Sequence, residues 1–198
     1  KGNKEIKVTG DALLVATGVK PYSDTLNLEK TGVKTNKRGY IHVNKFLETS
    51  AKNIYALGDV AGVYLFRHSA NLEARYVTNN ILYKKRAVDY YPIPHAIFTD
   101  PQVAGVGLTE EQALERKKDY VIGKYYYKNT GMGQALQETE GFAKFIVDKK
   151  TKEIIGFHII GPQASTAIHE VLIAMKAGKK KALDLIRETI HIHPALSE

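Results

Sequence analysis

The sequence contains no cysteine, no tryptophan and only two methionines. A chain without cysteine can form no disulfide, no thiolate metal site and no redox-active dithiol from its own residues. If this protein takes part in thiol chemistry, the sulfur must therefore come from elsewhere.

Long hydrophobic runs are also missing. No stretch approaches the roughly 20 consecutive apolar residues that span a bilayer, and residues 1–10 lack the apolar centre of a signal peptide. We therefore expect a soluble, cytoplasmic protein without a membrane partner. With 43% hydrophobic residues in a chain of 198, a sizeable core can still form, in one large domain or two small ones.

Positive charge exceeds negative charge, with 29 Lys and Arg against 21 Asp and Glu and a formal net charge of +8. Such a surplus can attract nucleic acid or an anionic substrate. The basic clusters are scattered at expected turns and helix ends, without an aromatic-interleaved stripe: residues 84–86, 117–118, 149–150 and 179–181. We therefore expect a solvated surface and no nucleic-acid partner. Steep salt-dependent DNA binding would be needed to support the alternative.

The first half of the chain has the pattern of an α/β unit. The nearly continuous apolar run of residues 11–18 ends in glycine, which predicts a strand buried on both faces of a parallel sheet. Residues 53–59 repeat this form, and residues 40–43 predict a short strand between them. A helix is predicted over residues 69–83, because apolar side chains are spaced for one face: Ala70, Ala74, Val77 and Ile81. A strand that ends in the acidic residue Asp59, followed by a loop and a helix, is typical of half of a nucleotide-binding unit.

The second half is strand-rich and predicts an α+β domain, an antiparallel sheet with helices on one face. Two prolines near residues 90–94 place the domain boundary there, giving domains 1–91 and 92–198. Strands are predicted at residues 95–98, 102–108 and 120–128, with a hairpin over 141–161. Helices are predicted after the capping box of Thr109 and Gln112, from Pro162 to a stop at Gly178, and over residues 182–189.

The end of the chain carries a compact acid–base set, His191, His193 and Glu198. Histidine titrates near neutral pH, and a carboxylate bound to one ring nitrogen leaves the other free to take or give a proton. Exposed histidines at a frayed terminus are the alternative on spacing alone. A metal site is disfavoured, because side chains two residues apart in an extended segment point to opposite faces.

Three further motifs are less specific. Asp59 follows an expected buried strand, where open α/β sheets bind ligands, and it serves equally well as a turn residue. Gly18 is either a ligand-approach glycine or an ordinary turn glycine. Residues 131–133 begin like a dinucleotide fingerprint, but Leu136 occupies the position of the third glycine, so we interpret this segment as a loop.

Four segments, in this order and at this separation, resemble the flavoprotein pyridine nucleotide-disulfide oxidoreductases, most closely the dihydrolipoamide dehydrogenases and relatives such as mycothione reductase. The resemblance covers essentially the whole chain, and the occurrence of these segments together is far more specific than any single motif. The segments are ATGVKP (residues 16–21), NIYALGDVAG (53–62), FTDPQVAGVGLTE (98–110) and HIHPALSE (191–198).

The resemblance implies a fold and two cofactors, FAD and NAD(P). Residues 1–91 would be the C-terminal part of a FAD-binding Rossmann-like region, and residues 92–198 an α+β dimerisation domain. Asp59 matches the carboxylate that binds the ribityl chain, and Gly18 would approach the nicotinamide nucleotide. Four residues at the matching distance would line the flavin: Leu65, Phe66, Arg67 and His68.

The resemblance also implies a redox enzyme that works as a homodimer. His193 would be the acid–base residue, with Glu198 as its orienting partner, and would reach the active site of the other subunit. Electrons would pass between a dithiol substrate, here a lipoyl group, a redox disulfide, FAD and NAD(P).

The family's glycine fingerprint, its cysteine pair and its NAD domain have no counterpart in the sequence. We therefore expect a C-terminal fragment that is inactive alone and holds FAD weakly. The alternatives are a mycothione- or glutathione-type reductase, less readily a mercuric-type reductase, and a non-catalytic dimerisation module.

Overall fold

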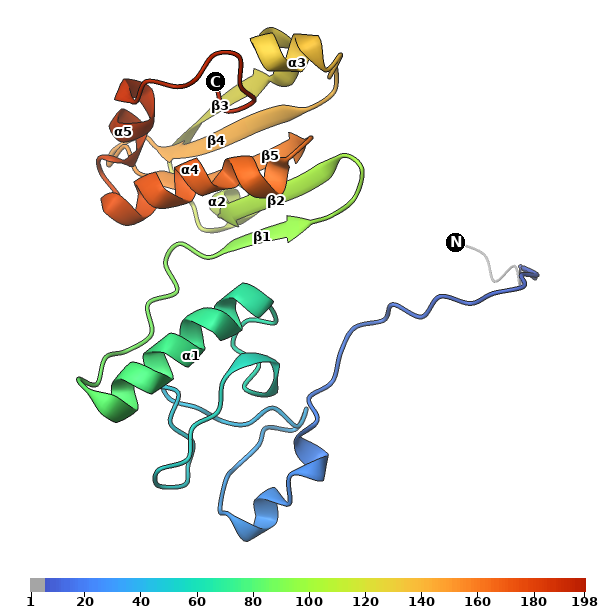
Figure 1. The fold of residues 1–198 in the computed structure, drawn as a ribbon, viewed down its shortest axis with the longest axis vertical. Coiled ribbons are helices and arrows are strands. Elements are labelled where there is room, and N and C mark those ends of the chain that lie inside the picture. Colours follow the sequence, from blue (N-terminus) through green and yellow to red (C-terminus); the bar gives the residue numbers. More distant parts are fainter. Residues whose placement is uncertain (1–5) are drawn as a thin grey trace. The chain divides into compact units, whose positions relative to one another are not determined.

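The computed structural model describes residues 6–198, so residues 1–5 of the segment searched for a signal peptide lie outside the described residues. The chain divides into two compact units, Lys1–Val88 and Asp89–Glu198 (Figure 1). Each unit is described here by itself. No helix in the described part of the chain is long and apolar enough to cross a membrane.

The described residues of the first unit form one long helix, α1 (Arg67–Leu82), and three short 3-10 turns: η1 (Ser23–Thr25), η2 (Leu28–Lys30) and η3 (Gly58–Val60). The loops between them are joined by two isolated bridges, Thr35 to Ile41 and Glu48 to Tyr55. A small core forms from four buried side chains: Val33, Ile41, Ala56 and Ala61.

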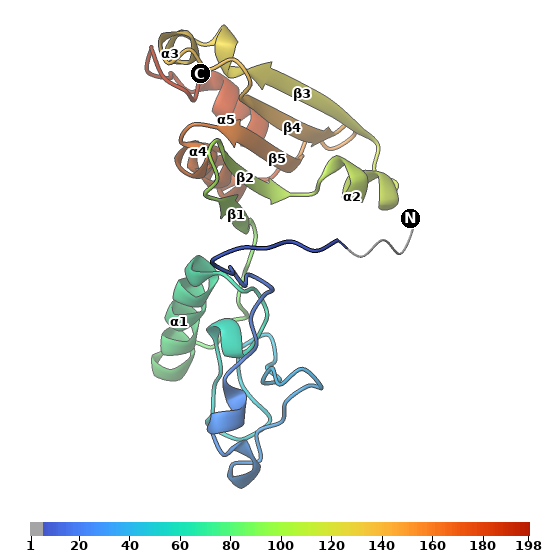
Figure 2. The ribbon, with the colours of Figure 1, turned by 90° about the vertical axis from the view of Figure 1, so that its right-hand side faces the viewer.

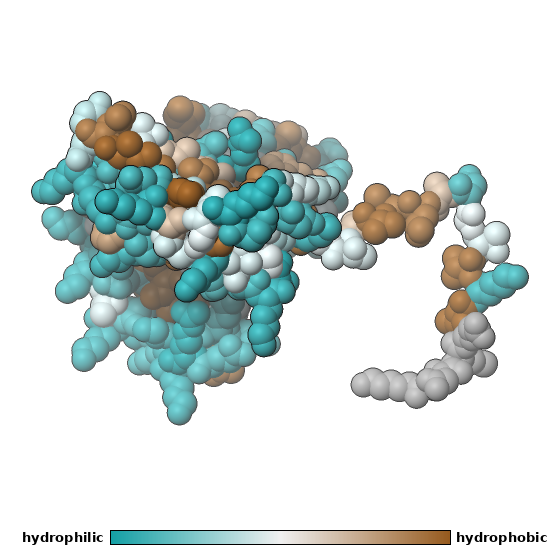
Figure 3. All heavy atoms as spheres, turned by 90° about the horizontal axis from the view of Figure 1, so that it is seen from below, coloured by the Kyte–Doolittle hydropathy of each residue, from teal (hydrophilic) through white to brown (hydrophobic). Residues whose placement is uncertain are grey.

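The strands predicted in this unit are wrong. Residues 11–18 run extended without a strand partner, and Leu13 and Leu14 are 87% and 89% exposed. Apolar side chains are accordingly uncovered along the extended segment beside the grey residues in Figure 3. Residues 40–43 and 53–59 contribute only to the isolated bridges. A parallel strand needs neighbouring strands and covering helices, and the described residues of this unit supply no such neighbours.

Helix α1 confirms the helix predicted over residues 69–83, but its buried stripe differs from the prediction. Ser69, Glu73 and Val77, spaced four residues apart, are buried, whereas Ala74 and Ile81 are exposed. The helix thus turns one polar and one charged side chain inward. Ile81 continues the four-residue spacing but lies at the last turn of the helix, where it is exposed.

The second unit is built on the predicted antiparallel sheet, whose five strands lie in the order β1-β2-β5-β4-β3. The strands are β1 (Pro94–Ile97), β2 (Gln102–Gly107), β3 (Tyr120–Tyr126), β4 (Phe142–Asp148) and β5 (Ile154–Gly161). The predicted hairpin is confirmed, because Asp148 accepts the backbone N–H of Thr151 at 2.8 Å and closes the turn between β4 and β5.

Helices α4 (Ala164–Ala177) and α5 (Ala182–Glu188) pack on one face of this sheet and enclose the main core (Figures 1 and 2). Phe157 and Ile159 of β5 point into this core. Gly178 ends α4, and Thr109 caps a shorter helix, α2 (Glu110–Glu115), through its predicted capping box with Gln112. Both predictions are confirmed.

Helix α2 (Glu110–Glu115) lies on the opposite face of the sheet, so the expectation of helices on one face only is wrong (Figure 2). Residues 131–133 are also not a loop. They open a short helix, α3 (Gly131–Ala135), which follows the 3-10 turn η4 (Tyr127–Asn129). The side chain of Thr130 accepts the N–H of Gly133 at 3.0 Å, and this cap starts the helix.

Candidate active-site residues

The C-terminal segment after α5 brings His193 and Glu198 into direct contact. The Nδ1 atom of His193 lies 2.7 Å from Oε1 of Glu198. The other carboxylate oxygen, Oε2, accepts the backbone N–H of Ala195 at 2.9 Å. One carboxylate therefore closes the turn and holds the imidazole ring at the same time.

The electrostatics of this pair favour an ionised carboxylate, which orients the imidazole ring. The backbone N–H of Ala195, followed by the hydrogen bond from His193, holds the pKa of Glu198 below its ordinary value. An ionised carboxylate only accepts, so Nδ1 of His193 carries the proton and Nε2 keeps a lone pair. The His193 side chain is 73% exposed, which leaves Nε2 open to a reactant.

The His193 ring packs over Gly131 at the start of α3. A Cβ atom at residue 131 would lie 2.8 Å from Cε1 of His193 and 3.4 Å from its Nε2. Any larger residue would therefore displace the ring from its place beside Glu198. The sequence analysis missed Gly131, although the Gly-x-Gly pattern was the available signal.

His191 turns away from His193 toward helix α4. Its Nε2 atom lies 3.4 Å from Oε2 of Glu170, and this contact joins the C-terminal segment to the helix. Opposite directions for the two histidines are what an extended segment requires. Among the described residues, no group of three or more His, Cys, Asp or Glu side chains could hold a metal ion.

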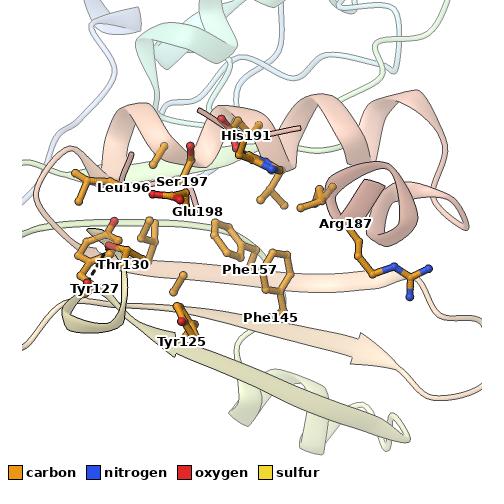
Figure 4. A pocket seen from close by; sticks show the side chains of 16 residues that line it. Tyr125, Tyr127, Thr130, Phe145, Phe157, Arg187, His191, Leu196, Ser197 and Glu198 are labelled. Carbon is orange, nitrogen blue, oxygen red and sulfur yellow. Dashed lines mark hydrogen bonds and ion pairs between the residues drawn. The ribbon is translucent and has the colours of Figure 1, made fainter. Parts of the chain in front are cut away.

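A cavity of about 300 Å³ lies beside this segment. Figure 4 shows His191 and Glu198 above the rings of Phe145 and Phe157, so the C-terminal segment and the sheet form facing walls. Tyr127 also lines the cavity, and its buried hydroxyl has no hydrogen-bond partner among the described residues. Burial, together with the charge of Glu138, raises the pKa of Tyr127 to about 12.

In the first unit, Asp59 lies on the glycine-bounded turn η3. Gly58 and Gly62 have φ angles of +69° and +68°, a backbone region that favours glycine. The Asp59 side chain is exposed. The buried carboxylate of Glu73 accepts the backbone N–H of Gly58 at 2.5 Å and ties the turn to α1.

Sequence reasoning missed Glu73. An acid at four-residue spacing between Ser69 and Val77, on the inward face of the helix, was the signal that could have revealed it.

The other predicted cofactor residues divide into two groups. Residues 65–68 lead into and begin α1, the helix that contacts η3, so the structure gathers them in the same unit as Asp59. The rings of Phe66 and His68 stack with centroids 4.9 Å apart, and Leu65 is exposed. Gly18 does not join this group, because a Cβ placed there would meet nothing within 4 Å.

These surroundings fit one edge of FAD. An exposed carboxylate on a glycine turn suits the hydroxyls of a polyol chain, and a Cβ at Gly62 would lie 2.4 Å from the Tyr40 ring, so that turn is tightly packed. Asp59 and residues 65–68 could hold the ribityl part and the flavin. Gly18 forms no comparable cradle among the described residues.

Comparisons with known proteins agree over both units. Residues 93–198 match the family described as pyridine nucleotide-disulphide oxidoreductase, dimerisation domain. Residues 1–78 match the family described as pyridine nucleotide-disulphide oxidoreductase.

Curated relatives include dihydrolipoyl dehydrogenase 3 of Haloarcula marismortui, 37% identical over 99% of this chain and 41% of its own length. Mycothione reductase of Mycobacterium tuberculosis is 39% identical over 96% of this chain and 42% of its own length. The chain thus spans about two fifths of the length of these relatives.

Among solved structures, the HOCl-induced flavoprotein disulfide reductase RclA from Escherichia coli superposes with a TM-score of 0.87. The match has 33% sequence identity and covers 94% of this chain and 43% of that chain.

Proposed function

Because the chain belongs to the pyridine nucleotide-disulphide oxidoreductase family, we propose that it is the C-terminal part of a dihydrolipoyl dehydrogenase. The family consists of flavoprotein oxidoreductases that use FAD and a pyridine nucleotide. The observation that carries the proposal is the contact between His193 and Glu198, which prepares a ring nitrogen for proton transfer. The substrate is a dithiol, the lipoyl group.

In the proposed mechanism His193 is the acid–base residue and Glu198 its positioning partner. The Nε2 atom of His193 takes the proton of a substrate thiol. The resulting thiolate attacks one sulfur of a disulfide supplied by residues outside this chain, forming a mixed disulfide as the old sulfur–sulfur bond breaks. In the reverse direction the imidazolium returns the proton to the departing sulfur. Glu198 accepts from Nδ1 throughout and stabilises the charged ring.

The proposed cofactor site uses the first unit. Asp59 binds hydroxyls of the ribityl chain, and residues 65–68 line the flavin. FAD supplies two-electron redox chemistry when bound. The Glu73 carboxylate fixes the turn that presents Asp59 by accepting the backbone N–H of Gly58.

We also propose that the second unit forms a homodimer in which His193 serves the partner's active site. The proposal is supported by three apolar side chains on helix α4 and the C-terminal segment that are largely exposed: Ile173, Ile190 and Ile192. Exposed large apolar side chains are expected on a surface that a second subunit covers.

The function is tested with the complete protein, by measuring kcat/KM for lipoamide and for the disulfides of mycothiol and glutathione with NADH and NADPH. We expect lipoamide with NADH to be preferred. A preference for mycothiol disulfide would favour the second candidate, which rests on the 39% identity to mycothione reductase. If the complete protein reduced none of these disulfides, the remaining interpretation would be a non-catalytic dimerisation module.

A further inference from the structure

The face of the sheet that turns away from α4 carries two histidines on either side of a glycine. His95 of β1 pairs directly across from Gly105 of β2, and Gly105 pairs directly across from His158 of β5. The neighbours of His158 on β5, Phe157 and Ile159, point into the core beside α4. Since successive side chains alternate between faces, His158 lies on the opposite face.

Because Gly105 has no side chain, the two imidazole rings meet above its backbone. A Cβ atom built on Gly105 would lie 2.6 Å from Nδ1 of His158 and 2.9 Å from Nε2 of His95. Both ring nitrogens are therefore no more than 2.9 Å from the same point. Imidazole nitrogens bind zinc at about 2.0–2.1 Å, so a shared ion would sit farther from the Gly105 backbone than this point, and the two rings would rotate toward each other to reach it.

The hydrogen bond made by His158 leaves Nδ1, the ring nitrogen beside Gly105, available to bind a metal ion. Its Nε2 atom lies 2.9 Å from the carbonyl oxygen of Leu108. A carbonyl can only accept, so Nε2 carries the proton and Nδ1 keeps its lone pair toward the space above Gly105. Metal-binding histidines are oriented in this way, with the second ring N–H donated to a carbonyl or carboxylate.

The local charge is compatible with a bound cation. Burial, and then the nearby His158, lowers the pKa of His95, which favours the neutral form of the ring. The nearest cation along the same row of the sheet is Lys144, paired directly across from His158. Its Nζ atom forms an ion pair with Glu110 of α2, which offsets its repulsion. Both histidines are half-buried and reachable from solvent.

We propose that His95 and His158 form a two-imidazole site for a divalent transition-metal ion such as Zn²⁺, with water completing the coordination shell. Imidazole suits zinc, copper and nickel, whereas magnesium and calcium prefer oxygen ligands. The site is separate from the His193–Glu198 pair and independent of the proposed redox function. Two protein ligands and a solvent-facing position make it a site of moderate affinity.

The test is a calorimetric titration of the 198-residue chain with Zn²⁺ at pH 7.5, in a buffer that does not bind metals. We expect saturable binding of one ion, and a shift of the His158 Nδ1 resonance in ¹⁵N NMR spectra. Binding should weaken at pH 5.5, because protons compete for the same nitrogens.

Two variants decide the assignment, and two others are controls. His95→Gln removes one ligand, and Gly105→Ala fills the shared space with a methyl group that pushes flexible ring ends rather than backbone. Both should lower the affinity by about tenfold or more, with unchanged circular dichroism. His169→Gln and His193→Gln should bind as the parent chain does. Survival of binding in either test variant, loss of binding in either control, or no saturable binding in the parent chain would overturn the assignment.

Discussion

Glu198 contacts His193 directly, with one carboxylate oxygen 2.7 Å from Nδ1 of the ring. The other carboxylate oxygen accepts the backbone N–H of Ala195 at 2.9 Å and so closes the turn that carries the histidine. The tautomer of the ring and the path of the chain thus depend on one side chain. The role of the ring in proton transfer and the stability of the turn can be tested separately.

Replacing His193 by Gln in the complete protein should lower lipoamide-dependent kcat by about 10²- to 10⁴-fold, because positioned acid–base groups usually contribute this much. Steady-state kinetics with lipoamide and NADH measure the effect. His169→Gln, an exposed histidine of α4, is the matched control and should leave kcat unchanged. Turnover that barely changes in the His193 variant would remove the assigned role.

Acid should release the C-terminal turn. The folded pKa of Glu198 is lowered, so its contribution to stability is fully present above the unfolded value, near 4.3. That contribution is lost as pH falls through the lower folded pKa. NMR of the Ala195 amide across pH 7 to 2 should show its hydrogen-bond shift lost with an apparent pKa below the ordinary value of a glutamate. In Glu198→Gln this transition should be absent.

Removing the carboxylate of Glu73 should loosen the turn at η3. Glu73→Ala leaves the buried N–H of Gly58 without its acceptor, and an unsatisfied buried donor costs about 1–3 kcal/mol. Hydrogen exchange of Gly58 and of the α1 amides measures the loss. Glu73→Gln keeps an acceptor oxygen and should lose less, and Glu29→Ala, an exposed acid of η2, should lose nothing. Equal protection in all three variants would contradict the role.

Tyr127→Phe should stabilise the second unit. The Tyr127 hydroxyl is buried without a partner among the described residues, and such a group costs about 1–3 kcal/mol. Thermal unfolding should therefore occur at a higher temperature in the variant. Tyr125→Phe is the control, because that hydroxyl donates to Asn129 at 3.3 Å on the exposed side of the strand, and its removal should not raise the midpoint.

The purified 198-residue chain should hold FAD weakly. The described residues offer Asp59 and the start of α1, and Gly18 meets nothing within 4 Å, so only one edge of the cofactor has a fitting surface. Flavin absorbance after extensive dialysis measures retention. A chain that stays yellow would show a more complete site than these residues supply.

The second unit could be predicted from the sequence because its signals are local. Alternating apolar residues on either side of the turn at Asp148 specify β4 and β5, and the Thr109 capping box and Gly178 set helix ends. The His193–Glu198 contact followed from spacing and family motif together. Spacing alone favoured exposed histidines at a frayed terminus.

The structure of the first unit was harder to predict, because strands of the predicted kind depend on neighbouring strands for their hydrogen bonds. Residues 11–18 have the composition of a buried strand, but composition does not supply the adjacent strand that hydrogen bonding requires. Glu73 was missed for the opposite reason, since burial of a charge depends on a tertiary partner, the N–H of Gly58. The imidazole pair over Gly105 was also invisible, because His95 and His158 are 63 residues apart and meet only through strand order.

The strand order β1-β2-β5-β4-β3 also has a kinetic consequence. The pairs β1–β2, β3–β4 and β4–β5 join segments that are near in sequence, whereas β2–β5 joins residues 102–107 to residues 156–161. Closing that one long loop carries the largest chain-entropy penalty, so it should form late during folding. His95 lies on one side of this seam and His158 on the other. The two rings should therefore approach each other only when the β1–β2 hairpin pairs with the β3–β4–β5 meander to complete the sheet.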